Sequence, residues 1–291
     1  MDYFIHVLVL AAINGMLALS LALLAGHAGL ISLAHASFFG FGAYGAALIA
    51  LGVRQPDLAF TALACVVSAA ALSLFVSIPC TRLSGDYLVI ATLGFQTIIT
   101  SLFNNMRSVT NGPQGVAGIP LPRLFGAHIT EPWQFLVVAM MTTSGLYLIV
   151  TRILNTAAGR LLHALRADET FTRSLGRDTF GTKVAIFAFA AGVAALAGVI
   201  YAHYITFIDP GTFSASESIV LLSMVIAGGA GSVTGPLVGA LVLTLVPEAL
   251  RFVGVPGPTT AAIRQMLYGL LLVAVMLARP SGIHSSWQRR Q

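Results

Sequence analysis

The segment NTAAGRLLHALRADETFTRSLGRDTFGTK, residues 155–183, is the only long polar stretch in an otherwise apolar chain. With the adjoining Arg152 it holds six of the 15 Lys and Arg residues and three of the 10 Asp and Glu residues. We expect one amphipathic helix from Gly159 to Gly176, with an apolar arc of about 120°, a separate basic face, and Gly176 as its C-terminal cap. The apolar arc holds Leu161, Ala164, Leu165, Phe171 and Leu175, and the basic face holds Arg166, Arg173 and Arg177.

A carboxylate inside the apolar arc, that of Asp168, separates two interpretations of this helix. A helix that lies on an anionic inner membrane surface explains the basic face and needs no protein partner. A helix that docks into a groove of a cytoplasmic protein also explains Asp168, because a buried carboxylate needs a partner. The segment alone leaves both interpretations open.

The composition is that of a membrane protein with several spans. Of the 291 residues, 57% are hydrophobic and only 9% are charged, whereas soluble domains are about 25% charged. No loop is long enough to form a soluble domain, so we expect a single transmembrane domain over residues 1–291. The net charge of +5 is typical of cytoplasmic loops, and no basic patch with interleaved aromatic residues suggests a nucleic-acid partner.

Apolar segments of the length that crosses a membrane, about 20 residues, occur nine times, and two of them are short and polar. We therefore expect an all-α polytopic membrane protein with about eight or nine transmembrane helices, some of them broken or re-entrant. The candidate segments are 3–25, 30–52, 58–79, 86–103, 133–151, 183–205, 217–230, 235–253 and 261–278.

The positions of the basic residues predict an orientation, because cytoplasmic loops are enriched in Lys and Arg. With residues 152–183 in the cytoplasm, ten of the 15 basic residues lie inside, including Arg82, Arg279 and those of the tail 280–291. The amino terminus is then external. The loop 104–132 is external as well, and its four glycines and four prolines predict structured turns rather than a span.

Three stretches place polar side chains within the spans. Residues 26–48 combine serines and histidines with five glycines, residues 85–105 carry a polar helical face, and residues 207–241 start a helix with an acidic first turn. Broken helices and polar groups at membrane depth line transport paths, but tight packing, interhelical hydrogen bonds and a helix-end charge explain the same residues. The candidates for a translocation path are Ser32, His35, Thr92, Gln96, Thr100 and Glu217.

Catalytic motifs are absent from the sequence. The run from Gly176 to Lys183 imitates a phosphate-binding loop, but its lysine stands one position late and Val184 follows where Ser or Thr is needed. Cys65 and Cys80 match no metal or redox spacing. We expect neither ATP hydrolysis nor a metal or other cofactor in this chain. A transport protein of this kind is either a passive channel or one part of a driven complex.

Six motifs follow one another along the chain: GHAGLISLAHASFFGFGAY, GDYLVIATLGFQ, TNGPQGVAGIP, GRLLHALRADE followed by LG, IDPGTF followed by SI, and GGAGSVTGPLVGAL. Taken in this order, they resemble the permease subunits of branched-chain amino-acid ABC importers of the LivM-like type. The resemblance extends over residues 26–255, and its strength lies in the order of the motifs rather than in any one of them.

The resemblance implies an inner-membrane permease that moves a small solute by alternating access. It implies a second, related permease, ABC ATPase subunits on the cytoplasmic side and a soluble substrate-binding protein that faces residues 112–120. The polar segment then becomes the coupling helix that contacts the ATPase, with membrane lipid around the rest of the chain. The family positions in that helix are occupied by Gly159, Arg160, Ala164, Arg166, Asp168, Glu169, Leu175 and Gly176.

Three positions depart from the family pattern: Ala34 and Asn111 stand where glycine is usual, and Thr172 replaces a small alanine. None of them removes a charge. The resemblance leaves the substrate open among branched-chain amino acids, urea, amides and aromatic acids. Two other classes compete with it, a self-sufficient channel for a solute such as urea and a membrane enzyme that uses one of the histidines.

Overall fold

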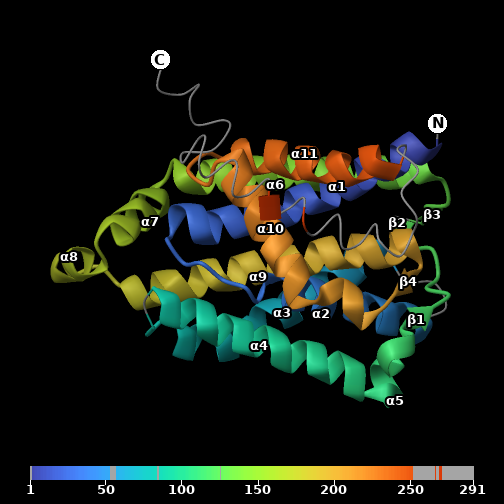
Figure 1. Cartoon of the computed structure of the whole chain (residues 1–291), viewed down its shortest axis with the longest axis horizontal. Helices are drawn as coiled ribbons and strands as arrows, with labels where there is room; N and C mark the ends of the chain where they lie inside the picture. The colour runs from blue at the N-terminus through green and yellow to red at the C-terminus, as the bar shows by residue number, and fades with distance from the viewer. Residues whose placement is uncertain are drawn as a thin grey trace.

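The computed structural model describes residues 2–52, 57–83, 85–124 and 126–251, together with residues 266, 269 and 270. Within this part of the chain, eleven α-helices form an elongated bundle whose long helices run side by side (Figure 1). Helices α7 and α8 project from one end, which we call the α8 end. The amino terminus, α5 and all four short strands gather at the other, the α5 end. The all-α prediction is confirmed.

Among the described residues, six helices are long and apolar enough to cross a membrane, and two shorter apolar helices follow them. Together they account for eight of the nine predicted segments, and the ninth, 261–278, lies almost wholly outside the described residues. The long helices are α1 (Asp2–Leu21, extended by a π-helical turn Ala22–His27), α2 (His35–Gly52), α3 (Leu58–Cys80), α4 (Asp86–Asn105), α6 (Pro132–Leu154) and α9 (Thr179–Ile205). The shorter ones are α10 (Ala215–Gly228) and α11 (Gly235–Arg251).

Helix α9 forms the centre of the bundle, where it packs against α1, α2 and α3. Glycines bring its backbone into direct contact with α2. A Cβ atom on Gly42 would overlap the carbonyl oxygen of Ala195, and one on Gly198 would overlap that of Phe39. Small residues permit such close approach of membrane helices, which maximises van der Waals contact where the hydrophobic effect is weak. Helices α2 and α9 therefore form one tightly packed unit.

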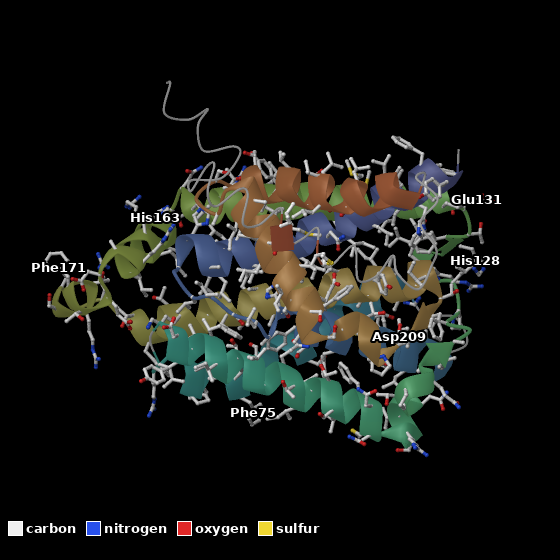
Figure 2. All side chains as sticks on the ribbon, in the orientation of Figure 1. Phe75, His128, Glu131, His163, Phe171 and Asp209 are labelled. Carbon is white, nitrogen blue, oxygen red and sulfur yellow. The ribbon has the colours of Figure 1, made fainter. Side chains whose placement is uncertain are left out.

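The outer helices α3, α4 and α6 expose an apolar face along most of their length. Less than a third of the most apolar stretch of each is buried, compared with 83% for α1. Phe75 of α3 is 82% exposed and stands out from the flank of the bundle (Figure 2). Exposed apolar surface of this extent is typical of a membrane-facing or subunit-facing flank.

The loop 104–132 folds into short ordered elements at the α5 end, as predicted. These are α5 (Arg107–Thr110), a 3₁₀ turn (Gly112–Gln114), β1 (Val116–Ala117), β2 (Arg123–Leu124) and β3 (Ala127–His128). Strand β1 pairs antiparallel with β4 (Phe207–Ile208), which follows α9, and β2 pairs with β3. A second 3₁₀ turn (Pro210–Phe213) then leads into α10. The loop is thereby tied to the end of the central helix.

The prediction of one helix from Gly159 to Gly176 is wrong. Helix α7 (Ala157–Ala167) ends at Asp168, whose backbone is extended, and the short helix α8 (Glu169–Ser174) begins directly after it. The Asp168 carboxylate accepts a hydrogen bond from the backbone N–H of Phe171 at 2.9 Å. It therefore caps α8, and an N-cap residue needs a non-helical backbone. Gly176 follows α8 with φ of +74°, which confirms it as the terminating glycine.

The break at Asp168 also changes the predicted apolar stripe. Leu165 is buried as expected, but Phe171 and Leu175 are 62% and 65% exposed. Phe171 lies at the outer tip of the projection (Figure 2). The predicted stripe is therefore wrong as one buried face: Leu165 packs on the bundle, whereas Ala164, Phe171 and Leu175 are exposed.

Candidate functional site

A layer of polar side chains lies halfway along the bundle, centred on Gln96. Gln96 is the eleventh of the 20 residues of α4. Its side-chain oxygen accepts hydrogen bonds from the backbone N–H and the hydroxyl of Ser37, at 2.8 and 2.7 Å, and its amide donates to the carbonyl of Phe213 at 2.7 Å. The start of α2 and the residues before α10 therefore lie at the middle depth of α4.

Both α2 and α10 begin inside the bundle rather than at its end. The residues between the π-helical turn of α1 and His35 are irregular, so α2 starts only at half depth. The free N–H groups of its first turn are satisfied by side chains: Ala36 donates to the hydroxyl of Ser218 at 3.1 Å, and Ser37 donates to Gln96. The irregular segment before His35 confirms the predicted interruption in residues 26–48. The side-chain contacts stabilise the interrupted helix, because unpaired N–H groups are costly away from water.

We call this set of residues the polar layer: Ser20, Ser32, His35, Ser37, Thr92, Gln96, Thr100 and Ser218. Its further hydrogen bonds join the Ser20 hydroxyl to His35 Nε2 at 2.7 Å and the Leu33 N–H to the Thr92 hydroxyl at 3.1 Å. Of these eight side chains, all but Thr100 are at most 2% exposed. The layer offers hydroxyl, amide and imidazole groups, which can donate and accept hydrogen bonds without an ionised group.

The structure brings five of the six predicted path residues into the polar layer. The sixth, Glu217, lies one residue before Ser218 in the first turn of α10 and is partly buried. Ser20, Ser37 and Ser218 were not predicted as path residues. Ser20 is the single serine of a largely apolar helix, and the partners of Ser37 and Ser218 lie in distant parts of the chain, so the sequence gives little indication of their roles.

An aromatic cluster adjoins the polar layer on the side of the α5 end. The ring of Phe213, which is fully buried, lies within 6.4 Å, centroid to centroid, of four other aromatic rings. Gly40 permits this packing, since a Cβ atom there would lie 2.7 Å from the Phe213 ring. The neighbouring rings belong to Phe39, Tyr44, Phe103 and Tyr201.

At the α8 end, some of the predicted coupling residues bind the bundle. Arg166 of α7 donates a hydrogen bond to the carbonyl of Gly26, at the end of the first span. Glu169 of α8 forms an ion pair of 2.5 Å with Lys183 of α9, and the Lys183 ammonium also donates to the carbonyl of Thr81 at 3.3 Å. Gly159 is buried where α7 folds back on α6, and a Cβ atom there would overlap the carbonyl oxygen of Leu154. These contacts fix the projection to the long helices.

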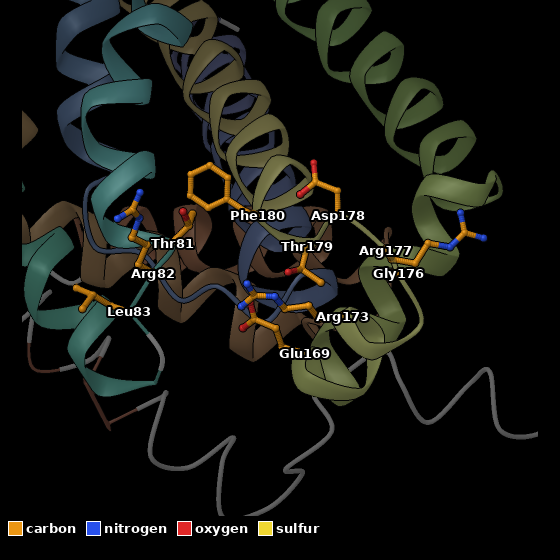
Figure 3. Close-up of a pocket in the computed structure, with 10 residues that line it drawn as sticks. All are labelled: Thr81, Arg82, Leu83, Glu169, Arg173, Gly176, Arg177, Asp178, Thr179 and Phe180. Carbon is orange, nitrogen blue, oxygen red and sulfur yellow. The ribbon is translucent and has the colours of Figure 1, made fainter.

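The other coupling residues are exposed. Arg160 and Ala164 lie on the open face of α7, and Asp168 marks the corner between α7 and α8. Beside α8, a cavity of about 730 Å³ is lined by Arg82, Arg173, Arg177 and Phe180, among others. Figure 3 shows Arg173 next to Glu169 beneath the start of α9, whereas Arg177 points away from them. The projection therefore presents both apolar and basic groups outward.

Comparison with known proteins identifies the family. Residues 3–276 match the family described as branched-chain amino acid transport system / permease component. The chain belongs to this family. The permease is accordingly a multi-pass protein of the inner membrane, with the apolar helices and interrupted spans described above.

Curated relatives agree with this assignment. The permease is 31% identical to the high-affinity branched-chain amino acid transport system permease protein LivM of Salmonella typhimurium, over 92% of its own length and 66% of the relative. It is 30% identical to the LivM protein of Escherichia coli, over 96% and 69% of the two chains. It is also 28% identical to the autoinducer 2 import system permease protein LsrC of Salmonella typhi, over 65% and 52%. The permease thus spans about two thirds of the length of the two LivM proteins. No solved structure matches it.

Proposed function

We propose that this permease is the transmembrane subunit of an ATP-driven ABC importer that carries branched-chain amino acids or a related small polar solute. The observation that carries the proposal is the α7–α8 projection, which is joined to the long helices by Arg166, Glu169 and its buried face and exposes the rest of its surface. A self-contained channel does not need such a projection. It suits a chain that receives movement from a partner.

The charge distribution supports an orientation for the proposed importer. The α8 end carries Arg82, Arg152 and the basic residues of the projection, so it faces the cytoplasm by the positive-inside rule. The α5 end then faces outward, and its ordered loop 104–132 is the surface that receives a soluble substrate-binding protein. A second, related permease completes the path, and membrane lipid covers the remaining apolar flank.

The polar layer is the proposed translocation path. Two interrupted helices begin there, and the positive ends of such half-helices favour an anionic group such as a substrate carboxylate. The aromatic cluster around Phe213 provides an apolar surface nearby for an aliphatic side chain. In alternating access, the hydrogen bonds between Gln96 and the starts of α2 and α10 are exchanged for contacts with the passing solute.

The exposed part of the projection is the proposed docking surface for ABC ATPase subunits. Phe171 and Leu175 present large apolar side chains at its tip, next to Arg173. An apolar anchor with a basic rim is typical of a protein interface rather than of a free surface. The ATPase supplies the hydrolysis for which this chain has no motif.

Purification of the tagged permease from its native membrane tests the proposal. A P-loop ATPase and a second permease are expected to co-purify. The Phe171→Ala/Leu175→Ala variant should weaken ATPase binding about thirtyfold and so lower its recovery, because truncated interface anchors cost about 2 kcal/mol. Leu148→Ala, which removes a leucine that is 61% exposed on the flank of α6, is the matched control. Substrate flux through liposomes that contain the permease alone would overturn the proposal in favour of a channel.

A further inference from the structure

We propose that the Glu169–Lys183 ion pair is the link through which movement of the α7–α8 projection reaches the transmembrane helices, so that Lys183 is a positioning residue for transport. This inference rests on the proposed function. The predicted coupling residues then fall into two groups: those that contact the ATPase, and those that transmit its movement to the long helices. The supporting observations concern the surroundings of Lys183, the tight packing of its helix, and the meeting of several segments at the same place.

Lys183 occupies an unusual position for a lysine. It is the only lysine in the sequence, and only 3% of its surface is exposed, although it lies in the second turn of α9. An isolated buried ammonium is strongly unfavourable, so its place depends on the groups that bind it. Those groups are the carboxylate of Glu169 at 2.5 Å and the carbonyl of Thr81 at 3.3 Å. The ammonium therefore holds α8, α9 and the turn after α3 together.

The helix that carries Lys183 is well suited to transmit movement. Helix α9 is the central helix of the bundle, and its backbone touches that of α2 at Gly42 and Gly198, which have no side chain to separate the helices. Because no side chains separate the two backbones at this contact, a displacement at the start of α9 moves α2 as well. Because α2 begins in the polar layer, the displacement reaches the Ser37–Gln96 hydrogen bonds.

Several segments converge beside the ion pair. A small cavity of about 100 Å³ lies among Gly29, Gly85, Arg166, Glu169 and Lys183. These residues belong, in this order, to the irregular segment before α2, the start of α4, α7, α8 and α9. The Arg166 hydrogen bond to Gly26 adds a second attachment on the same side. A partner that pulls on the tip of α8 thus acts on the ends of several long helices through these two attachments, and the ion pair, together with the short turn that follows α8, reaches the central helix.

Neutral variants of each partner test this role in the reconstituted importer with its ATPase subunits and binding protein. Glu169→Gln and Lys183→Met are each expected to retain the ATPase subunits while the amount of substrate moved per ATP hydrolysed falls about tenfold, the scale of a coupling free energy between sites. The double variant should be no worse than either single variant, because both remove the same interaction. Lys183→Arg, which keeps the charge, should retain most of the coupling. Asp86→Asn removes an exposed carboxylate at the same end and serves as the control.

Three results would overturn the inference: an unchanged transport-to-ATP ratio in both single variants, additive losses in the double variant, or loss of the ATPase subunits from Glu169→Gln alone. The last result would place Glu169 in the docking surface instead. If a variant fails to fold, hydrogen exchange of the unaltered complex tests the inference instead. Binding of a non-hydrolysable ATP analogue should change the protection of residues 169–174 and 179–187 together, and a change in only one of the two segments would overturn the inference. Failure of the proposed function itself is separate, because the unaltered permease would then neither retain an ATPase nor transport on addition of ATP.

Discussion

Replacement of Gln96 by leucine should destabilise the permease by about 3 kcal/mol. The change keeps the approximate size of the side chain but removes its five hydrogen bonds, which are two from Ser37, one from Ser218, and those to Thr100 and Phe213. At about 0.6 kcal/mol for each hydrogen bond within a membrane protein, the five contribute about 3 kcal/mol. The N–H of Ser37 keeps its second hydrogen bond, to the carbonyl of Ala34 at 3.1 Å, so no unpaired backbone group adds to this cost.

The free energy of unfolding can be measured by titrating the purified permease in mixed micelles with a denaturing detergent. Thr97→Val is the matched control, because Thr97 lies at the same depth on the exposed side of α4 and its hydroxyl bonds only within its own helix. It should change the free energy of unfolding by less than about 0.5 kcal/mol. Equal destabilisation by the two variants, or none by Gln96→Leu, would refute the central place given to Gln96 in the polar layer.

Two further predictions concern the backbone. Gly42→Val should prevent recovery of folded permease, because the new side chain overlaps the backbone of α9. Gly52→Val at the end of the same helix should be tolerated, since no atom of the described residues is found within 4 Å of its added Cβ. Yields of monodisperse protein measure both. Asp168→Ala should destabilise α8 by about 1 kcal/mol through loss of its N-cap, and Asp168→Asn should retain most of that energy. Hydrogen exchange in residues 169–174 tests the difference, and equal protection in the two variants would contradict the capping role.

The long apolar segments allowed the fold to be predicted from the sequence, because the length of an apolar run determines whether a helix can cross a membrane. The interruption near His35 was also predictable, since glycines and polar residues share a short stretch within a span. The depth at which α2 and α10 meet was not predictable. It depends on hydrogen bonds between residues more than 50 positions apart, such as those of Ser37 with Gln96 and of Ala36 with Ser218.

The error in the coupling segment has a local cause. Apolar periodicity continues across Asp168, so the pattern indicates a single helix, but one residue with an extended backbone is enough to redirect the chain. An aspartate at the N-cap with a glutamate in the first turn is a recognised start signal for a helix, and Asp168-Glu169 offered it in the sequence. The Glu169–Lys183 contact could not be inferred, because it joins residues across the turn between α8 and α9.

The solitary buried lysine has a practical consequence for chemistry on this protein. Reagents that acylate primary amines have, apart from the amino terminus, one target in the whole chain, and in the described structure that amine is 3% exposed and held by Glu169. Its rate of acylation therefore measures how often the contact between α8 and α9 opens. A probe attached there under turnover would mark that opening at a single known atom, without the introduction of any cysteine.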